Sequence, residues 1–149
     1  MSDWEDDCPI CLKHLRQGPL AAEIIHETEL LVASHAPITE QGGVYLGYLF
    51  VEPRRHVAEL GDLTEQEAEA LGLIAMRLSR VLQQAQGAEH VYAAVVGHHV
   101  EHLHLHLIPR YPDTPPELNW TQVTDWEDAP RGNAVAVSEV AARIRAALT

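Results

Sequence analysis

The stretch HLHLHLIPR, residues 102–110, constrains this chain more than any other feature. Three histidines, His102, His104 and His106, alternate with leucines. Neighbouring side chains in a β-strand point to opposite faces, so the pattern predicts a strand over 103–108 with the imidazoles on one face and the leucines in the core. Residues two apart along a strand are about 7 Å apart at Cα, which gives each imidazole room for a separate role.

Three chemical uses of such a row compete. Imidazoles of the row can bind a metal ion together with a ligand from elsewhere in the chain. Alternatively, an unprotonated ring can attack phosphorus while its neighbours hold phosphate oxygens. The third interpretation is a polar strand face exposed to solvent, and it is the least favoured because the three histidines alternate strictly and are followed by Pro109 and Arg110.

Length and charge narrow the class of protein. With 149 residues and 46% hydrophobic content, the chain is long enough for one compact domain over 1–149 without disulfides. The formal net charge of -12 argues against a nucleic acid polymer as partner, because binding phosphate backbones requires a basic face. The start is acidic and no apolar run approaches the roughly 18 residues of a membrane span, so a cytoplasmic protein that does not contact membranes is expected.

Hydrophobic patterning predicts an α+β fold. The predicted strands are residues 21–26, 30–35, 44–53, 90–96 and 103–108. Thr64 and Glu67 form a capping box before a long helix that ends near Gly87. The architecture expected is a central antiparallel sheet of about five strands with one long and one short helix.

The last part of the chain is predicted to be an irregular arm followed by the short helix. Residues 111–136 contain several prolines together with Trp120 and Trp126. We expect tryptophan to pin this arm to its own core, rather than to stack on a ligand or a partner. Ser138 is predicted to cap a closing helix over 137–149.

Cys8 and Cys11 form a CxxC pair within an amino-terminal segment, residues 1–20. Such a pair is either half of a zinc site or a redox pair. A redox pair needs a thioredoxin-like setting in which the cysteines open a helix, and no such pattern follows Cys11. Because the chain has 10 histidines, zinc is favoured. Candidate histidine ligands that the sequence leaves open are His14, His26 and His35.

The histidine row resembles the signature of the histidine triad (HIT) superfamily, and the Pro-Arg that follows it resembles the dinucleoside polyphosphate hydrolase branch. Upstream, GYLFVEPRRH at 47–56 is similar to the central strand of that family, and LTEQE at 63–67 is similar to the start of its long helix. The resemblance covers Cys8 to Arg110. It implies a HIT-like fold, a homodimer, and a hydrolase or transferase acting at the α-phosphate of a nucleotide conjugate.

The position of each residue in the motif implies its role. His104, the middle histidine, would be the nucleophile that forms a nucleotidyl-histidine intermediate. His106 would bind a non-bridging phosphate oxygen, aided by backbone N–H groups near Gly97. Arg54, Arg55 and Arg110 are candidates for local positive charge, and Arg110 is the one assigned to substrate binding.

Zinc-bearing branches of the superfamily also resemble this chain. They carry a CxxC pair, a histidine after the proline-basic turn, and the first histidine of the triad. Position by position, the ligands implied are Cys8, Cys11, His56 and His102. Four protein ligands close the coordination sphere, so this zinc would be structural.

One departure from the family concerns the residues after Gly97. Many members carry a glutamine and then a serine or threonine there, at positions that contact the scissile bridge or the leaving group, whereas this chain has His98 and His99. We expect His98 to contribute to substrate binding. We expect His99 to donate a proton to the leaving atom.

Two other functions remain open at this point. The chain could be a nucleotide-binding regulator that binds AMP without turnover. It could instead be a metal-dependent enzyme that uses the triad as ligands, in which case a chelator abolishes activity outright.

Overall fold

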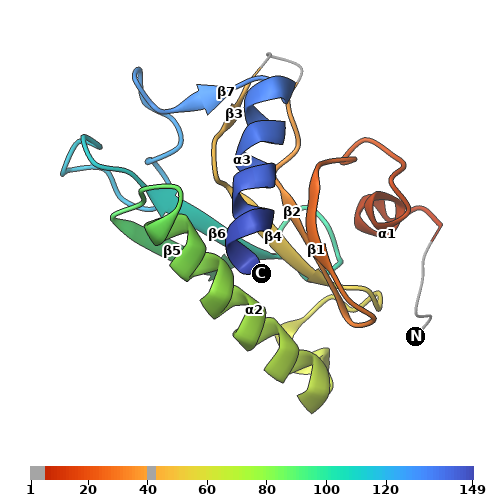
Figure 1. Cartoon of the computed structure of the whole chain (residues 1–149). Coiled ribbons are helices and arrows are strands. Elements are labelled where there is room, and N and C mark those ends of the chain that lie inside the picture. Colours follow the sequence, from red (N-terminus) through yellow and green to blue (C-terminus); the bar gives the residue numbers. More distant parts are fainter. Residues whose placement is uncertain (1–5, 40–42) are drawn as a thin grey trace.

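A computed structural model describes residues 6–39 and 43–149 of the chain, and Figure 1 shows the arrangement of their elements. Five strands form one antiparallel sheet in the order β1-β2-β4-β6-β5. These strands are β1 (Ile24–Glu27), β2 (Leu31–His35), β4 (Leu49–Pro53), β5 (His90–Val95) and β6 (Leu105–Arg110). A separate two-stranded sheet pairs β3 (Val44–Tyr45) with β7 (Arg131–Gly132). The helices are α1 (Pro9–His14), the 3-10 turn η1 (Leu60–Asp62), α2 (Glu65–Gln84) and α3 (Ala134–Leu148).

The predicted α+β architecture, with a central antiparallel sheet, is confirmed. Helices α2 and α3 cover one face of the sheet, where Leu49 and Val51 of β4 and Leu107 of β6 are buried against them. The capping box at the start of α2 is also confirmed, since Thr64 Oγ1 accepts a hydrogen bond from Glu67 N–H and the Glu67 carboxylate accepts one from Thr64 N–H. These helices leave the other face of the sheet available for the site.

The amino-terminal helix α1 lies on that other face. Side chains alternate along β4, so the residue between Leu49 and Val51, Phe50, points away from α2 and α3. Glu52 shares this face, and its carboxylate is 2.8 Å from the ammonium of Lys13 in α1. Figure 1 shows α1 beyond β1, set apart from the two longer helices. The expectation that the cysteines open no helix was wrong, because Cys8 caps the first turn of this short helix by accepting from Cys11 N–H.

The predicted central strand over 44–53 is interrupted in the structure. It divides into β3 and β4 around Gly47, whose φ of 88° is readily available only to glycine. A Cβ at Gly47 would also collide with the Tyr111 hydroxyl. The N–H of Gly47 donates to Nε2 of His35, 2.9 Å away, instead of to a neighbouring strand.

The strand that carries the histidine row begins later than predicted. β6 starts at Leu105, so His102 and His104 lie just before it and only His106 lies within it. Leu103 N–H donates to the carbonyl of Val57 at 2.7 Å, outside the sheet ladder. The predicted start of the strand at 103 was therefore wrong, whereas the leucines at 103 and 107 are buried as expected.

The closing helix also differs from its prediction. α3 begins at Ala134, and its cap is Asn133, whose side-chain oxygen accepts from Ala136 N–H at 3.1 Å, so the predicted start at 137 with a Ser138 cap was wrong. The irregular arm is correspondingly shorter than 111–136 and contains β7. Among the described residues there are three α-helices in place of one long and one short helix. None of the helices in the described ranges has both the length and the apolar character that crossing a membrane demands.

The arm is pinned to the core by one of its two tryptophans. Trp126 packs against a buried cluster that includes Tyr45, Ile108 and Val123, whereas Trp120 is 41% exposed. The expectation of an arm held by its own core is thus confirmed for Trp126.

The observed start of α3 can be tested by one substitution at its cap and one inside the helix. Asn133→Ala removes the cap and should lower the free energy of unfolding by about 1 kcal/mol, because one N–H of the first turn loses its acceptor. Ser138→Ala, at an exposed position inside the helix, should leave stability the same or slightly higher. Urea denaturation of the two variants checks this, and a larger loss for Ser138→Ala would contradict the observed start.

Candidate functional site

Four side chains converge where α1 meets the segment before β6. The ligand atoms of Cys8, Cys11, His56 and His102 all lie within 4.8 Å of one another. His102 Nδ1 is 3.5 Å from both sulfurs, and His56 Nδ1 is 3.6 Å from Cys11 Sγ. The sequence predicted this same set, and the cluster can hold a metal ion.

The donor set and spacing fit a tetrahedral ion. Zinc with bonds of about 2.3 Å to sulfur and about 2.0 Å to nitrogen has a sulfur-to-nitrogen edge of about 3.5 Å, which the three distances reproduce. His102 is oriented for ligation, because its Nε2–H donates to the carbonyl of Pro53 at 2.7 Å and Nδ1 therefore keeps its lone pair. Burial lowers the pKa of His102 to about 4, which keeps the ring neutral.

The rival histidine ligands lie elsewhere. His14 Nε2 is 3.0 Å from a carboxylate oxygen of Glu52. His35 lies in β2 and bonds the carbonyl of Ala36 through Nδ1. His26 lies in β1 and is not part of the cluster found among the described residues.

His104 lies between the metal cluster and β6. Its Nδ1 is 2.7 Å from the backbone carbonyl of His102. A carbonyl only accepts, so Nδ1 carries the proton and Nε2 keeps its lone pair. The ring of Phe50 packs against His104 and against His106, with centroids 5.8 Å and 4.8 Å away.

His106 is held by a residue that the sequence did not single out. The Tyr48 hydroxyl is 2.6 Å from His106 Nδ1, while His106 Nε2 is buried and has no hydrogen-bond partner among residues 6–39 and 43–149. Burial and the neighbouring His104 lower the pKa of His106 to about 4, with Glu52 opposing them. Burial also raises the pKa of Tyr48 to about 12, so the hydroxyl keeps its proton. His106 is thus a neutral ring with one nitrogen still to be bonded.

A buried carboxylate lies beside these histidines. Glu52 is fully buried and accepts hydrogen bonds from Lys13 at 2.8 Å and from His14 at 3.0 Å. Burial by itself would raise the pKa of Glu52, but the charge of Lys13 and the hydrogen bonds from His14 and Lys13 outweigh it, so the pKa lies below its usual value. This group ties α1 to β4. The sequence signal for this buried carboxylate was a charged residue inside the apolar run LFVEP.

A small cavity of about 120 Å³ lies at two of the catalytic candidates, His104 and His106. His104 and His106 line it together with Lys13 and Glu52, and apolar side chains complete the wall, namely Ile10, Leu20, Pro37, Phe50 and Val100. The structure therefore brings His104 and His106 together on one cavity, close to the buried ion pair.

Other predicted site residues lie outside this cavity wall. His98 and His99 are exposed on the segment after β5, beside Gly97, and their roles stay predictions. The Arg110 guanidinium donates to Glu89, to the Tyr92 hydroxyl, and to the carbonyls of Leu118 and Pro115. These bonds anchor the arm.

The other two candidate arginines, Arg54 and Arg55, also form ion pairs within the fold. Arg54 lies 3.4 Å from Glu27, and Arg55 lies 2.7 Å from Glu67. Neither residue is in the wall of the small cavity. Among the described residues, Lys13 is the cationic side chain in that wall.

Comparison with known families and proteins settles the family. The model of the HIT domain matches residues 20–113, which is more than half of the chain. The chain belongs to the HIT domain family. The matched region of this HIT protein includes the histidine row, whereas Cys8 and Cys11 lie before it.

Individual relatives agree with this assignment. A bis(5'-adenosyl)-triphosphatase of Dictyostelium discoideum is 34% identical over 94 residues, which are 60% of this chain and 60% of the relative. The HIT protein thus spans well under two thirds of that relative's length. A zinc-bound histidine triad protein from Mycobacterium smegmatis has a TM-score of 0.69 at 20% identity, covering 95% of this chain and 93% of the other. A hypothetical histidine triad nucleotide-binding protein from Sulfolobus tokodaii has a TM-score of 0.71 at 20% identity, with 95% and 91% coverage.

The cluster should retain a metal ion through purification without chelator. We expect about one equivalent of zinc per chain by elemental analysis. Cys11→Ser should lose the ion and lower Tm by about 10 °C or more, because structural zinc contributes many kcal/mol to folding. His26→Gln, a change at a rival ligand, should retain both the ion and the Tm. Equal metal content in both variants would contradict the ligand set.

The pKa of His106 predicts a pH-dependent stability. The unfolded ring takes up a proton near pH 6.5, whereas the folded ring does so only near pH 4. The stability contributed by the neutral ring is therefore present above pH 6.5 and is lost as the pH falls from there toward 4. Between pH 7.5 and 5, wild type should lose more unfolding free energy than His106→Asn, as measured in urea. His90→Gln, at an exposed histidine, should follow wild type.

Proposed function

We propose that this HIT protein cleaves or transfers a nucleotidyl group at the α-phosphate of a nucleotide conjugate, with His104 as the nucleophile. The observation that carries the proposal is the hydrogen bond from His104 Nδ1–H to the carbonyl of His102, at 2.7 Å. It leaves the Nε2 lone pair available for attack on phosphorus. A bond then forms between Nε2 and phosphorus while the bond to the leaving group breaks.

His106 supplies the contact to the phosphate. With the Tyr48 hydroxyl donating to Nδ1, the single proton of the neutral ring lies on Nε2. This buried N–H has no partner within the described parts of the chain. A buried donor without an acceptor costs about 1–3 kcal/mol, and a non-bridging phosphate oxygen beside His104 would satisfy it.

The nucleotidyl-histidine intermediate is then cleaved by water or by a second acceptor. Attack on phosphorus breaks the bond to His104 Nε2 and returns the lone pair to the ring, and the proton from the water leaves with the released phosphate or to solvent. His99 would donate a proton to leaving groups that need one, such as an amine. His99 is exposed, and the next residue, Val100, lies in the wall of the small cavity.

The metal in this proposal is a structural zinc held by Cys8, Cys11, His56 and His102. These four ligands would fill a tetrahedral site, so a bound ion would supply cross-linking and no water activation. It would hold α1 against the segment that carries His104. The zinc-bound neighbour from Mycobacterium smegmatis supports this assignment.

The relatives support the substrate class. The name of the Dictyostelium protein describes hydrolysis of a bis(5'-adenosyl) triphosphate, and that protein shares 34% identity over the aligned region. We infer a purine nucleotide conjugate such as a dinucleoside polyphosphate or a nucleoside phosphoramidate. A cytoplasmic location fits this assignment, because thiolate ligands require a compartment that keeps cysteines reduced.

A homodimer is the assembly that we propose. β5 is an edge strand of the five-stranded sheet, so one side of its backbone is open to pairing with another chain. Val95 at its end and Leu73 and Met76 on α2 are exposed apolar side chains, with 42%, 48% and 43% of their surface accessible. Pairing of β5 with the β5 strand of a second copy would cover exposed apolar side chains of this kind.

The reaction is tested by AMP release from adenosine phosphoramidate, diadenosine polyphosphates and ADP-sugars. Wild type should release AMP from at least one of them, and His104→Ala should reduce kcat by about a thousandfold or more because the nucleophile is absent. His26→Gln should match wild type. Release that persists in His104→Ala would identify a different nucleophile.

The two alternative functions give distinct results in the same assay. A regulator would bind AMP in calorimetry but cleave no conjugate. A metal-dependent enzyme would lose activity at once on adding chelator, whereas a structural zinc should be lost slowly and together with Tm.

A further inference from the structure

A lysine of α1 lies at the histidines and has no part in the chemistry described so far. Lys13 is 2% exposed, and it belongs to the wall of the small cavity that His104 and His106 also line. The sequence predicted local positive charge from arginines beside the motifs, and not from this residue. A lysine is almost never buried so deeply without a specific partner.

The partner of Lys13 within the protein is Glu52. The ammonium lies 2.8 Å from a carboxylate oxygen of this residue. An ammonium has three N–H groups, and this contact uses one of them. Across residues 6–39 and 43–149, the other two have no hydrogen-bond acceptor. Lys13 therefore has buried donors available to an anion in the cavity.

Phe50 connects Lys13 to both histidines. The Lys13 ammonium is 5.3 Å from the centroid of the Phe50 ring, and the ring centroids of His104 and His106 are 5.8 Å and 4.8 Å from it. All three side chains thus lie against one aromatic ring. The cavity that they share, at about 120 Å³, is well below the roughly 300–1,000 Å³ of a site for a whole ligand, so it suits one small group such as a phosphoryl group.

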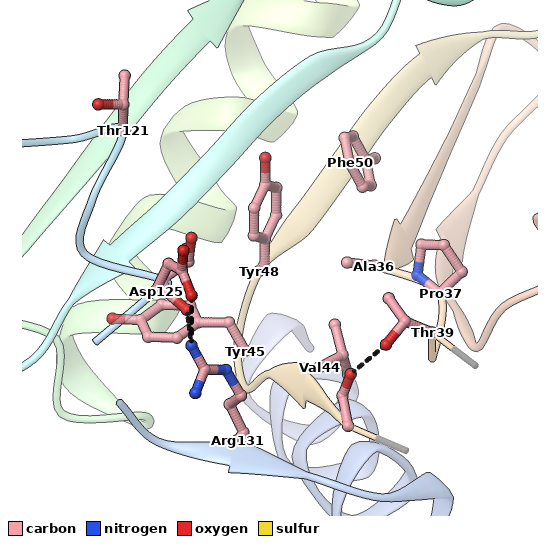
Figure 2. A pocket seen from close by; sticks show the side chains of 12 residues that line it. Ala36, Pro37, Thr39, Val44, Tyr45, Tyr48, Phe50, Thr121, Asp125 and Arg131 are labelled. Atoms are coloured by element: carbon pink, nitrogen blue, oxygen red, sulfur yellow. Dashed lines mark hydrogen bonds and ion pairs between the residues drawn. The ribbon is translucent and has the colours of Figure 1, made fainter. Parts of the chain in front are cut away.

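The cation of the neighbouring cavity is held elsewhere. This larger cavity, of about 950 Å³, shares Phe50 with the small one, and Tyr45 and Tyr48 add two more aromatic rings to its wall. Figure 2 shows Arg131 away from Phe50, where its guanidinium pairs with Asp125 at 3.4 Å. Within the described ranges, the cation that shares a wall with the histidines is therefore Lys13.

The charge of Glu52 makes this lysine necessary for binding an anion. Glu52 lines the small cavity as well. An ionised carboxylate in the wall would by itself repel a phosphate. The Lys13 ammonium cancels that charge and still offers N–H donors.

We propose that Lys13 contacts a non-bridging oxygen of the reacting phosphate, and that Glu52 positions it for this contact. The inference rests on the proposed function, because His104 and His106 define where that phosphate lies. His106 then donates to one non-bridging oxygen and Lys13 to the other. Together they stabilise the negative charge on these oxygens as His104 attacks.

Two variants that differ only at position 13 test the contact. Glu52→Gln keeps the lysine and removes its counter-charge, whereas Lys13→Met/Glu52→Gln removes both charges. Each would be titrated in a calorimeter with AMP and with adenosine, which lacks the phosphate. The double variant should bind AMP about tenfold or more weakly than Glu52→Gln, because a hydrogen bond to a charged group is lost. Adenosine should bind both variants equally.

Thermal stability separates the contact from a merely structural role. Glu52→Gln leaves a buried cation without its counter-charge and should have the lower Tm of the two variants. The more stable double variant should thus be the weaker binder of AMP. If Glu52→Gln is too unstable to titrate, wild type takes its place in the comparison.

An exposed ion pair provides the matched controls. Glu27→Gln and Arg16→Met/Glu27→Gln make the same changes of charge at a pair whose side chains are 39% and 62% exposed. Both should keep the wild-type affinity for AMP, because water and salt screen exposed charges.

Equal or reversed AMP affinities in the two position-13 variants, or a loss that adenosine shares, would overturn the inference. Wild type that binds no AMP would also overturn it. Failure of the proposed reaction is seen separately, as conjugates that stay uncleaved or as AMP release that persists in His104→Ala. AMP binding that depends on Lys13 supports the contact in either case.

Discussion

A carboxylate buried in the central strand of the sheet is the constraint on which the site depends. Removing a charge from water costs several kcal/mol unless partners replace the lost hydration, so Glu52 requires cations on its own face of the sheet. Lys13 supplies a cation and His14 a further hydrogen bond, and both belong to α1. The helix is thereby placed opposite α2 and α3, and its cysteines reach His56 and His102. The ion pair and the metal cluster hold the same helix from two sides.

Backbone carbonyls decide which nitrogen of His102 and of His104 is free. Pro53 accepts from His102 and leaves Nδ1 toward the cysteines, whereas the carbonyl of His102 accepts from His104 and leaves Nε2 available. Two residues of the same type, two positions apart, thus present opposite nitrogens. In the proposed function, these two hydrogen bonds separate metal ligation from nucleophilic attack.

Local patterns predicted the elements whose cause is local. The capping box before α2 and the strands β1 and β2 could be predicted from spacing, whereas the CxxC pair with its distant histidine ligands was predicted only through the resemblance to a family. The break in the central strand involves a distant residue. Gly47 has a φ of 88°, and the Tyr111 hydroxyl occupies the space that a Cβ there would need. The start of α3 was missed for a local reason, because Asn133, shortly before Ser138, is itself a favoured cap residue and takes the cap.

The sequence by itself determined the type of fold, and its motifs indicated the family and the candidate metal ligands. The fold type follows from periods of two or 3.6 residues, which are properties of a few consecutive peptides, whereas the family and the ligands came from the resemblance of whole motifs. Only the tertiary structure decided that Tyr48 holds His106, that Arg110 anchors the arm, and that a large aromatic cavity opens beside the catalytic row. Hydrogen bonds and cavity walls join residues distant in the chain, and their formation depends on how the layers pack, which no local pattern specifies.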